Sequence, residues 1–182
     1  MSRVLDRPRT LDDLIPLDRS ELMALFRTLP PPEPMDGEFV SALPAYSERL
    51  WRDTMASLGK PYWLGKSYSP EAFDGHQGHG LNRYRTGTGS IQRVARFVWD
   101  IGASTVDDRV SLVMRYGHFA NWGGSHDLID EIRLIAPGLY IGLYHTARPV
   151  PGFTPRDGGA RSGIEFFFLT GPAAPFVPAD AD

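Results

Sequence analysis

The amino-acid sequence predicts a mainly β protein, in which one up-and-down antiparallel β-barrel follows one or two N-terminal helices. From residue 60 onward apolar residues recur with a period of two, and short turns join the alternating segments. The chain is 12% aromatic and contains 19 glycines and 16 prolines, which is typical of β-rich folds with many turns. Closing such a sheet removes its edges, and a barrel of about eight strands can enclose one small ligand.

The clearest single element is a hairpin over residues 130–142. Pro137 fixes φ at about −65° and Gly138 accepts a positive φ, so a type II turn is predicted over Ala136–Leu139. The flanking runs alternate and are rich in Ile, Leu and Tyr, as expected of two strands that fold back on each other.

Short connections predict that neighbouring strands are antiparallel, because parallel strands need long crossovers. The short connections are Gly87–Gly89, Asp107-Asp108 and Pro137-Gly138. Two longer ones, His118–Asp127 and Arg148–Ser162, are expected to form a flap over the barrel mouth and a mobile loop. The candidate strands are Tyr62–Tyr68, Gly80–Thr86, Ile91–Gly102, Val110–Gly117, Leu128–Ala136, Leu139–Ala147 and Gly163–Thr170.

The N-terminal third is expected to be helical. Residues 1–19 form an arm, Ser20 is the expected N-cap of a helix over Glu21–Leu29, and a second helix is predicted over about Ala45–Leu58. One or both helices would plug or cover an end of the barrel. The predicted organisation is an arm (1–19), one domain (20–172, with helices over 20–59 and the barrel over 60–172) and a flexible tail (173–182).

Composition excludes several classes of function. A net charge of −3 offers no electrostatic attraction for nucleic acid or an anionic membrane, and the lack of cysteine excludes disulfides and thiolate metal sites. The chain has neither an N-terminal apolar signal region nor a run of about 20 apolar residues, so we expect a cytoplasmic protein. It also lacks a phosphate-binding loop and a nucleophile elbow, which disfavours nucleotide-dependent enzymes and serine hydrolases. We expect no cofactor.

Short motifs across residues 20–172 resemble a group of uncharacterised bacterial lipocalin-like proteins related to those with a Gly-x-Trp-x-Gly motif. The resemblance implies a lipocalin-like barrel that binds a small apolar molecule, and it supplies no catalytic residues. Phe39 stands where the name-giving Trp would be, although Trp63-Leu64-Gly65 is an alternative equivalent. The motifs are Leu29-Pro30, Met35–Phe39, Trp63-x-Gly65-Lys66, Ser104-x-x-Asp107-Asp108, Met114–Tyr116, Asp130–Arg133, Pro137–Gly142 and Phe166–Leu169.

Charges on the hairpin are the first candidate site. Alternation puts Asp130 on one face of its strand, and Glu131 and Arg133 on the other. A charge that faces the lumen needs a partner or a ligand, so whichever set points inward is a candidate ligand clamp or acid–base pair. The alternative is a cross-strand ion pair that fixes the register.

A second candidate lies around the expected flap. Tyr116 and His118 are predicted to share a strand face, near Trp122 and a His126-Asp127 pair in which the carboxylate could make the imidazole a general base. His76 and His79 lack further ligands at a family-like spacing, so no metal is expected.

The remaining candidates line the barrel wall. Glu165 could act as a second acid–base group if it faces the lumen, and Arg85 could bind an anionic oxygen. The other candidate wall residues are Trp99, Met114, Tyr144 and Phe167. We therefore expect a small hydrophobic ligand, aromatic or isoprenoid-like, and acid–base chemistry of the isomerase, cyclase or lyase type. A non-catalytic carrier or sensor is the alternative, and a homodimer joined through residues 20–58 is a further prediction.

Overall fold

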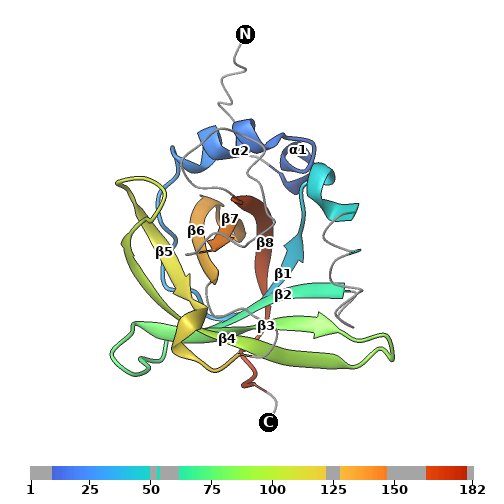
Figure 1. Ribbon diagram of the computed structural model, residues 1–182, viewed down its shortest axis with the longest axis vertical. Helices are drawn as coiled ribbons and strands as arrows, with labels where there is room; N and C mark the ends of the chain where they lie inside the picture. The colour runs from blue at the N-terminus through green and yellow to red at the C-terminus, as the bar shows by residue number, and fades with distance from the viewer. Residues whose placement is uncertain (1–9, 50–52, 54–61, 122–127, 147–162, 180–182) are drawn as a thin grey trace.

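The computed structural model describes residues 10–49, 53, 62–121, 128–146 and 163–179. They form a closed barrel of eight antiparallel strands in which each strand pairs with the next in the chain and the last pairs with the first (Figure 1). The predicted up-and-down β-barrel is therefore confirmed. The strands are β1 (Gly37–Ala42), β2 (Tyr62–Ser69), β3 (Gly78–Arg85), β4 (Ile91–Ala103), β5 (Val110–Arg115), β6 (Leu128–Ala136), β7 (Leu139–Thr146) and β8 (Glu165–Ala174).

The predicted hairpin is formed by β6 and β7. Gly138 has φ of +76°, which is the left-handed conformation that the turn requires. Arg133 pairs with Ile141 and Asp130 with Tyr144, and this register holds from Leu134 to Leu128, whereas it shifts by one residue between Leu134 and Ala136, beside the turn.

Sequence patterns missed the strand that closes the barrel. β1 has six residues and directly follows a proline-rich segment, which indicates a continuous loop. It pairs on one side with β2 and on the other with β8, where Glu38 lies opposite Ala174. β8 consequently continues to Ala174, although the sequence placed residues 173 and 174 in a flexible tail.

Two short helices precede the barrel: α1 (Leu11–Leu14) and α2 (Arg19–Phe26). Asp18, rather than Ser20, is the N-cap of α2: its side chain accepts a hydrogen bond from the Glu21 amide, and the Glu21 carboxylate accepts one from the Asp18 amide. This capping box explains why the helix begins earlier than predicted. Residues 45–49 are also helical, whereas most of the rest of the predicted second helix lies outside the described residues.

The helices pack on the outer wall of the barrel and not on its end. α1 and α2 lie beside β6, β7 and β8, on the opposite side of the barrel from β3 and β4 (Figure 1). Leu14, Leu22 and Phe26 pack against Ile141 and Phe168, whose side chains point away from the lumen. The apolar face of α2 is thus buried within its own chain. No described helix has the length and apolar character needed to cross a membrane.

The inward-facing side chains form a separate, strongly aromatic core. Glycines make room for its rings: a Cβ on Gly142 would lie 2.1 Å from the Phe167 ring, and one on Gly80 would lie 2.5 Å from the Phe97 ring. The fully enclosed members are Met35, Phe39, Tyr68, Phe97, Trp99, Leu112, Met114, Tyr116, Ile132, Phe167 and Leu169.

Candidate functional site

An ion pair spans the lumen of the barrel. The Nζ of Lys66, from β2, lies 2.6 Å from Oδ2 of Asp130, from β6. These strands are four positions apart in a ring of eight, so the two side chains come from opposite walls. Their inward direction follows from alternation, because Lys66 is two residues from Tyr68 and Asp130 is two residues from Ile132, and both neighbours belong to the interior core.

Tyr116 and Asn82 complete a hydrogen-bonded cluster with this pair. The Lys66 ammonium donates to Asn82 Oδ1 at 2.9 Å and to the Tyr116 hydroxyl at 2.5 Å. The Tyr116 hydroxyl donates to Asp130 Oδ2 at 2.9 Å and accepts from the Asn82 amide at 2.9 Å. Lys66 therefore uses all three of its donors. We refer to Lys66, Asn82, Tyr116 and Asp130 as the lumen cluster.

Aromatic rings enclose the ammonium of Lys66. Its Nζ lies 5.2 to 5.4 Å from the ring centroids of Trp63, Phe97, Tyr116 and Phe167. Such distances allow cation–π attraction, which partly replaces the hydration that the ammonium loses on burial. The Trp63 indole also donates to Asn82 Oδ1 at 3.0 Å, so this ring is oriented by the cluster.

Burial dominates the electrostatics of the lumen cluster. The side chains of Lys66 and Asp130 are only 2% and 5% exposed. Desolvation lowers the pKa of Lys66, and the charge of Asp130 opposes this shift without cancelling it. Burial likewise raises the pKa of Tyr116 well above its usual value, and the Asp130 charge adds to that shift.

One oxygen of the lumen cluster is left without a partner. Asp130 Oδ1 is buried and has no hydrogen-bond partner among the described residues, although Oδ2 of the same carboxylate contacts two groups. A buried carboxylate oxygen without a donor is unfavourable, and native proteins satisfy most such groups. A hydrogen-bond donor that entered the lumen beside Oδ1 would satisfy this oxygen.

A second charged group lies at one end of the lumen, where β7 ends and β8 begins. Glu165 pairs with Tyr144 in the register and forms an ion pair with Arg19 of α2. The Arg19 guanidinium also lies 5.2 Å from the Tyr46 ring centroid. Burial, followed by the charge of Glu165, raises the pKa of Tyr46 to about 12. Tyr144, Leu128 and Trp63 are only partly buried, so this end is the less enclosed part of the interior.

Several residues expected in the lumen do lie there. Asp130 and Tyr116 belong to the lumen cluster, whereas Trp99 and Met114 sit in the wall, with Met114 Sδ accepting a 3.4 Å contact from the Tyr68 hydroxyl. Phe167 packs edge-on against Trp63, and Tyr144 and Glu165 lie at the less enclosed end. Trp122 and the His126-Asp127 pair lie outside the described residues.

Of the two strand faces that alternation left open, the one with Asp130 points inward, so the candidate catalytic role of Glu131 in the lumen is wrong. Its position beside Asp130 sends the side chain to the outer face, where it accepts hydrogen bonds from the amide and hydroxyl of Thr105 at 2.7 and 2.5 Å. The Thr105 hydroxyl also contacts His145 Nε2 at 2.7 Å. Glu131 thereby fixes the connection between β4 and β5 on the outside of the barrel.

Arg133 and Arg85 also lie outside the lumen, contrary to the sequence-based expectation. Arg133 is fully buried between the barrel and α2, where it donates to both carboxylate oxygens of Asp107 and to the Phe26 carbonyl. It fastens the helix to the sheet. Arg85 is exposed at the end of β3, on the same face as Arg83, which pairs with Glu38 on the outer wall.

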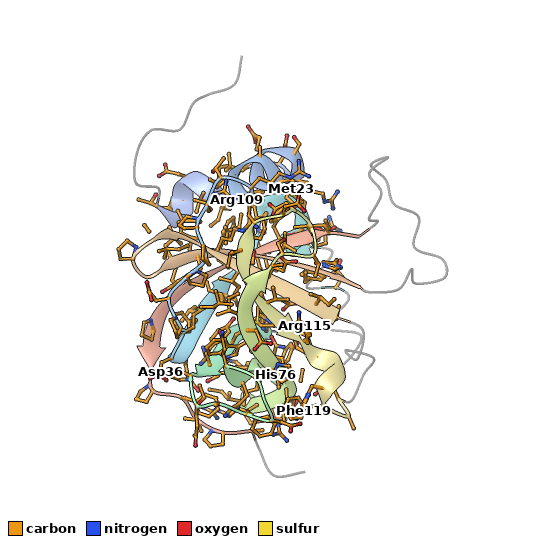
Figure 2. The ribbon with its side chains drawn as sticks, turned by 90° about the vertical axis from the view of Figure 1, so that its left-hand side faces the viewer. Met23, Asp36, His76, Arg109, Arg115 and Phe119 are labelled. Atoms are coloured by element: carbon orange, nitrogen blue, oxygen red, sulfur yellow. The ribbon has the colours of Figure 1, made fainter. Side chains whose placement is uncertain are left out.

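His118 does not share a face with Tyr116, because β5 ends at Arg115 and a short 3₁₀-helix, η1 (Tyr116–His118), turns the chain. The His118 ring lies 3.1 Å from Asp74 and packs against Phe119 and His76. In Figure 2, His76, Arg115 and Phe119 lie in the half of the molecule away from helix residue Met23. Among the described residues no three His, Asp or Glu side chains are placed to hold a metal ion.

Lys66, Asn82 and Trp63 belong to the site or its wall but were not predicted from the sequence as site residues. One signal was present: the chain has only two lysines, Lys60 and Lys66, and the alternation of β2 places Lys66 on the same face as Tyr68. A lysine on the apolar face of a strand is unusual, because lysine is almost never fully buried without a partner. No pattern in the sequence pairs it with Asp130, since β2 and β6 meet only across the closed barrel.

Comparison with known proteins supports the fold alone. No known family model matches the chain, and no curated protein sequence matches it. A solved structure, the crystal structure of a protein from Thermomonospora curvata, superposes with a TM-score of 0.54 over 85% of this chain and 87% of that one, at 19% sequence identity. At this identity the likeness extends to the barrel architecture and not to the site.

Proposed function

We propose that the barrel binds a small, flat, apolar molecule in its lumen and holds the oxygen-bearing group of that molecule at Lys66 and Asp130. The observation that carries this proposal is the unpartnered Asp130 Oδ1, buried beside Lys66 in an aromatic interior. Ligand sites typically combine apolar walls with a few convergent polar groups. A ligand hydroxyl would donate to Oδ1. A ligand carbonyl would accept from Lys66 or Tyr116 in place of one of the hydrogen bonds that these groups make within the lumen cluster.

Acid–base chemistry on the bound molecule is the second part of the proposal. Within the lumen cluster the groups suited to proton transfer are Asp130, Tyr116 and Lys66, which are in mutual contact. The shifted pKa values of Lys66 and Tyr116 support this role, because perturbed ionisable groups concentrate at functional sites. An isomerase or lyase reaction without a cofactor would need only such proton transfers.

Calorimetric titration tests the binding. The probes are naphthalene, 2-naphthalenemethanol and 2-acetonaphthone, which share one ring system and differ in the oxygen-bearing group. We expect the two oxygen-bearing probes to bind more tightly than naphthalene. Asp130→Asn should weaken binding of 2-naphthalenemethanol about tenfold, the effect of removing one buried charged hydrogen-bond acceptor. Asp100→Asn is the matched control, since Asp100 pairs with His76 and Arg115 on the outer wall.

A carrier function is the alternative, favoured by the fact that the ionisable groups of the lumen cluster already bond to one another. Recovering each probe after long incubation separates the two functions. An altered probe indicates turnover, and an unaltered one indicates a carrier. Equal affinity for all three probes in both variants, or no binding at all, would contradict the proposal.

A further inference from the structure

Lys66 has the surroundings of a nucleophilic amine. An amine attacks a carbonyl carbon only in its neutral form, and lysines used in this way are desolvated in apolar pockets. Aromatic rings surround Lys66 Nζ on several sides, and its side chain is 2% exposed. Desolvation lowers the pKa of this amine, which increases its neutral fraction near pH 7.

The neighbours of Lys66 match what amine–carbonyl condensation requires. Asp130 Oδ2, at 2.6 Å, can take a proton from Nζ and later return it. The Tyr116 hydroxyl contacts both groups and can donate a hydrogen bond to the carbonyl oxygen as it gains negative charge. Asn82 accepts from Nζ at 2.9 Å and fixes the direction of the amine.

We propose that Lys66 captures an aldehyde or ketone as an imine inside the barrel, with Asp130 as the proton acceptor and counter-ion. This inference rests on the proposed function, because the carbonyl compound must first enter the lumen. It narrows the ligand class from oxygen-bearing apolar molecules to carbonyl compounds.

The condensation balances with groups that are already in the lumen. Asp130 accepts a proton from the Lys66 ammonium, and the freed lone pair forms a C–N bond as the carbonyl π bond breaks. A proton then moves from nitrogen to the new alkoxide, which gives a neutral carbinolamine. Asp130 returns its proton to the hydroxyl, the C–O bond breaks, and water leaves. The cationic imine that remains is paired with the Asp130 carboxylate, so the net charge is unchanged.

Imine formation at Lys66 also gives a reason for an ion pair of lysine and aspartate in an aromatic interior. A buried ion pair is often no more stable than apolar side chains of similar volume, so stability alone does not favour keeping one. A covalent iminium has the same charge as the ammonium that it replaces, so the ion pair with Asp130 is kept. Its single N–H can donate to Asp130, whereas the hydrogen bonds from Nζ to Asn82 and Tyr116 are given up.

Reductive trapping tests the inference directly. Full-length protein is incubated with 2-naphthaldehyde and sodium cyanoborohydride at pH 7, and intact mass and peptide mapping locate the added naphthylmethyl group. The two lysines make the assignment unambiguous. We expect a single addition, at Lys66, at least about tenfold faster than at Lys60 or the N-terminal amine, because an aldehyde bound in the lumen is held beside Lys66 Nζ.

Matched variants provide the controls. Lys60→Arg should be trapped as fast as the parent chain, Lys66→Arg should lose the fast addition, and Asp130→Asn should slow it. Asp100→Asn, on the outer wall, should leave the rate unchanged. The parent chain by itself suffices for site mapping, so the test remains valid if a lumen variant fails to fold.

Binding of 2-naphthalenemethanol, which has no carbonyl group, separates the two proposals. If this alcohol binds in the lumen and the aldehyde is not trapped at Lys66, the imine proposal is overturned and the proposed function stands. If the alcohol does not bind and additions are spread over Lys60 and the N-terminus, both are overturned. A fast addition confined to Lys66 supports both.

Discussion

Lys66 and Asp130 face each other across the barrel from strands that are not neighbours in the sheet, with 2.6 Å between Nζ and Oδ2. The pair can exist only when the barrel is closed, because β2 and β6 have three strands between them in either direction. Closure of the fold and assembly of the lumen cluster are therefore one event.

Replacing one member of this ion pair should lower the free energy of unfolding far more than replacing both members. Lys66→Met leaves a buried carboxylate without its counter-charge, and we expect a loss of about 3–5 kcal/mol in the free energy of unfolding. The double variant Lys66→Met/Asp130→Leu should lose much less than the sum of the single changes. Urea denaturation of all four chains measures the coupling, and additive losses would show that the pair is not formed.

The tyrosines of the chain predict its behaviour at alkaline pH. Six of the seven have a raised pKa, with burial as the main cause: Tyr46, Tyr68, Tyr84, Tyr116, Tyr140 and Tyr144. Unfolded tyrosines ionise near pH 10, so above that pH the folded chain retains more protons than the unfolded one. Stability should consequently fall as pH rises past 10.

Absorbance at about 295 nm, the tyrosinate band, measures this titration. In denaturant all seven tyrosines should ionise together near the usual pKa of about 10. The native chain should ionise most of them only at higher pH, as it unfolds. Coincident native and denatured titration curves would contradict the enclosed interior.

Arg133 should matter for stability and not for binding. It is 0% exposed and joins α2 to the sheet through Asp107 and the Phe26 carbonyl. Arg133→Met leaves Asp107 without its main partner, and we expect a loss of about 3 kcal/mol or less, since Asp107 is partly exposed to water. Thermal denaturation measures the stability of this variant, and calorimetric titration measures its ligand binding. Unchanged stability together with weakened ligand binding would contradict the prediction and indicate that Arg133 contacts the ligand.

Gly142 should tolerate no side chain. A Cβ there would lie 2.1 Å from the Phe167 ring, which itself lies beside Lys66. Gly142→Ala should therefore destabilise the barrel by about 1–3 kcal/mol, the usual effect of overpacking a core. Gly87→Ala is the control, because nothing lies within 4 Å of a Cβ at that turn position. Equal stability of the two variants would mean that Phe167 can move aside freely.

Local patterns predicted the barrel well because its strands are sequential neighbours. Alternation located seven of the eight strands, and the Pro137-Gly138 turn located the hairpin of β6 and β7, although the register shifts between Leu134 and Ala136. β1 is no shorter than β5, which was predicted, but it follows a proline-rich segment and its pairing with β8 is the longest-range contact in the sheet.

The site was predicted less well, because alternation defines two faces without saying which of them is inside. Asp130 and Glu131 are adjacent and both are buried, one in the lumen and one beneath the β4–β5 connection. Only closure and the packing of α2 distinguish these surroundings. Lys66 and Asn82 can be recognised as site residues only from their contacts with Asp130 and Tyr116. Those two residues are distant in the sequence and reach them only across the lumen.

Lysine Nζ resonances give the most direct test of a ligand site at the lumen cluster. With ¹⁵N-labelled lysine the chain should give two Nζ signals, and the Lys66→Arg spectrum assigns them. Addition of 2-naphthalenemethanol should shift the Lys66 signal and leave that of Lys60 in place. A Lys66 signal that stays fixed while the alcohol binds, or equal shifts of both signals, would contradict a ligand site at Lys66 and Asp130.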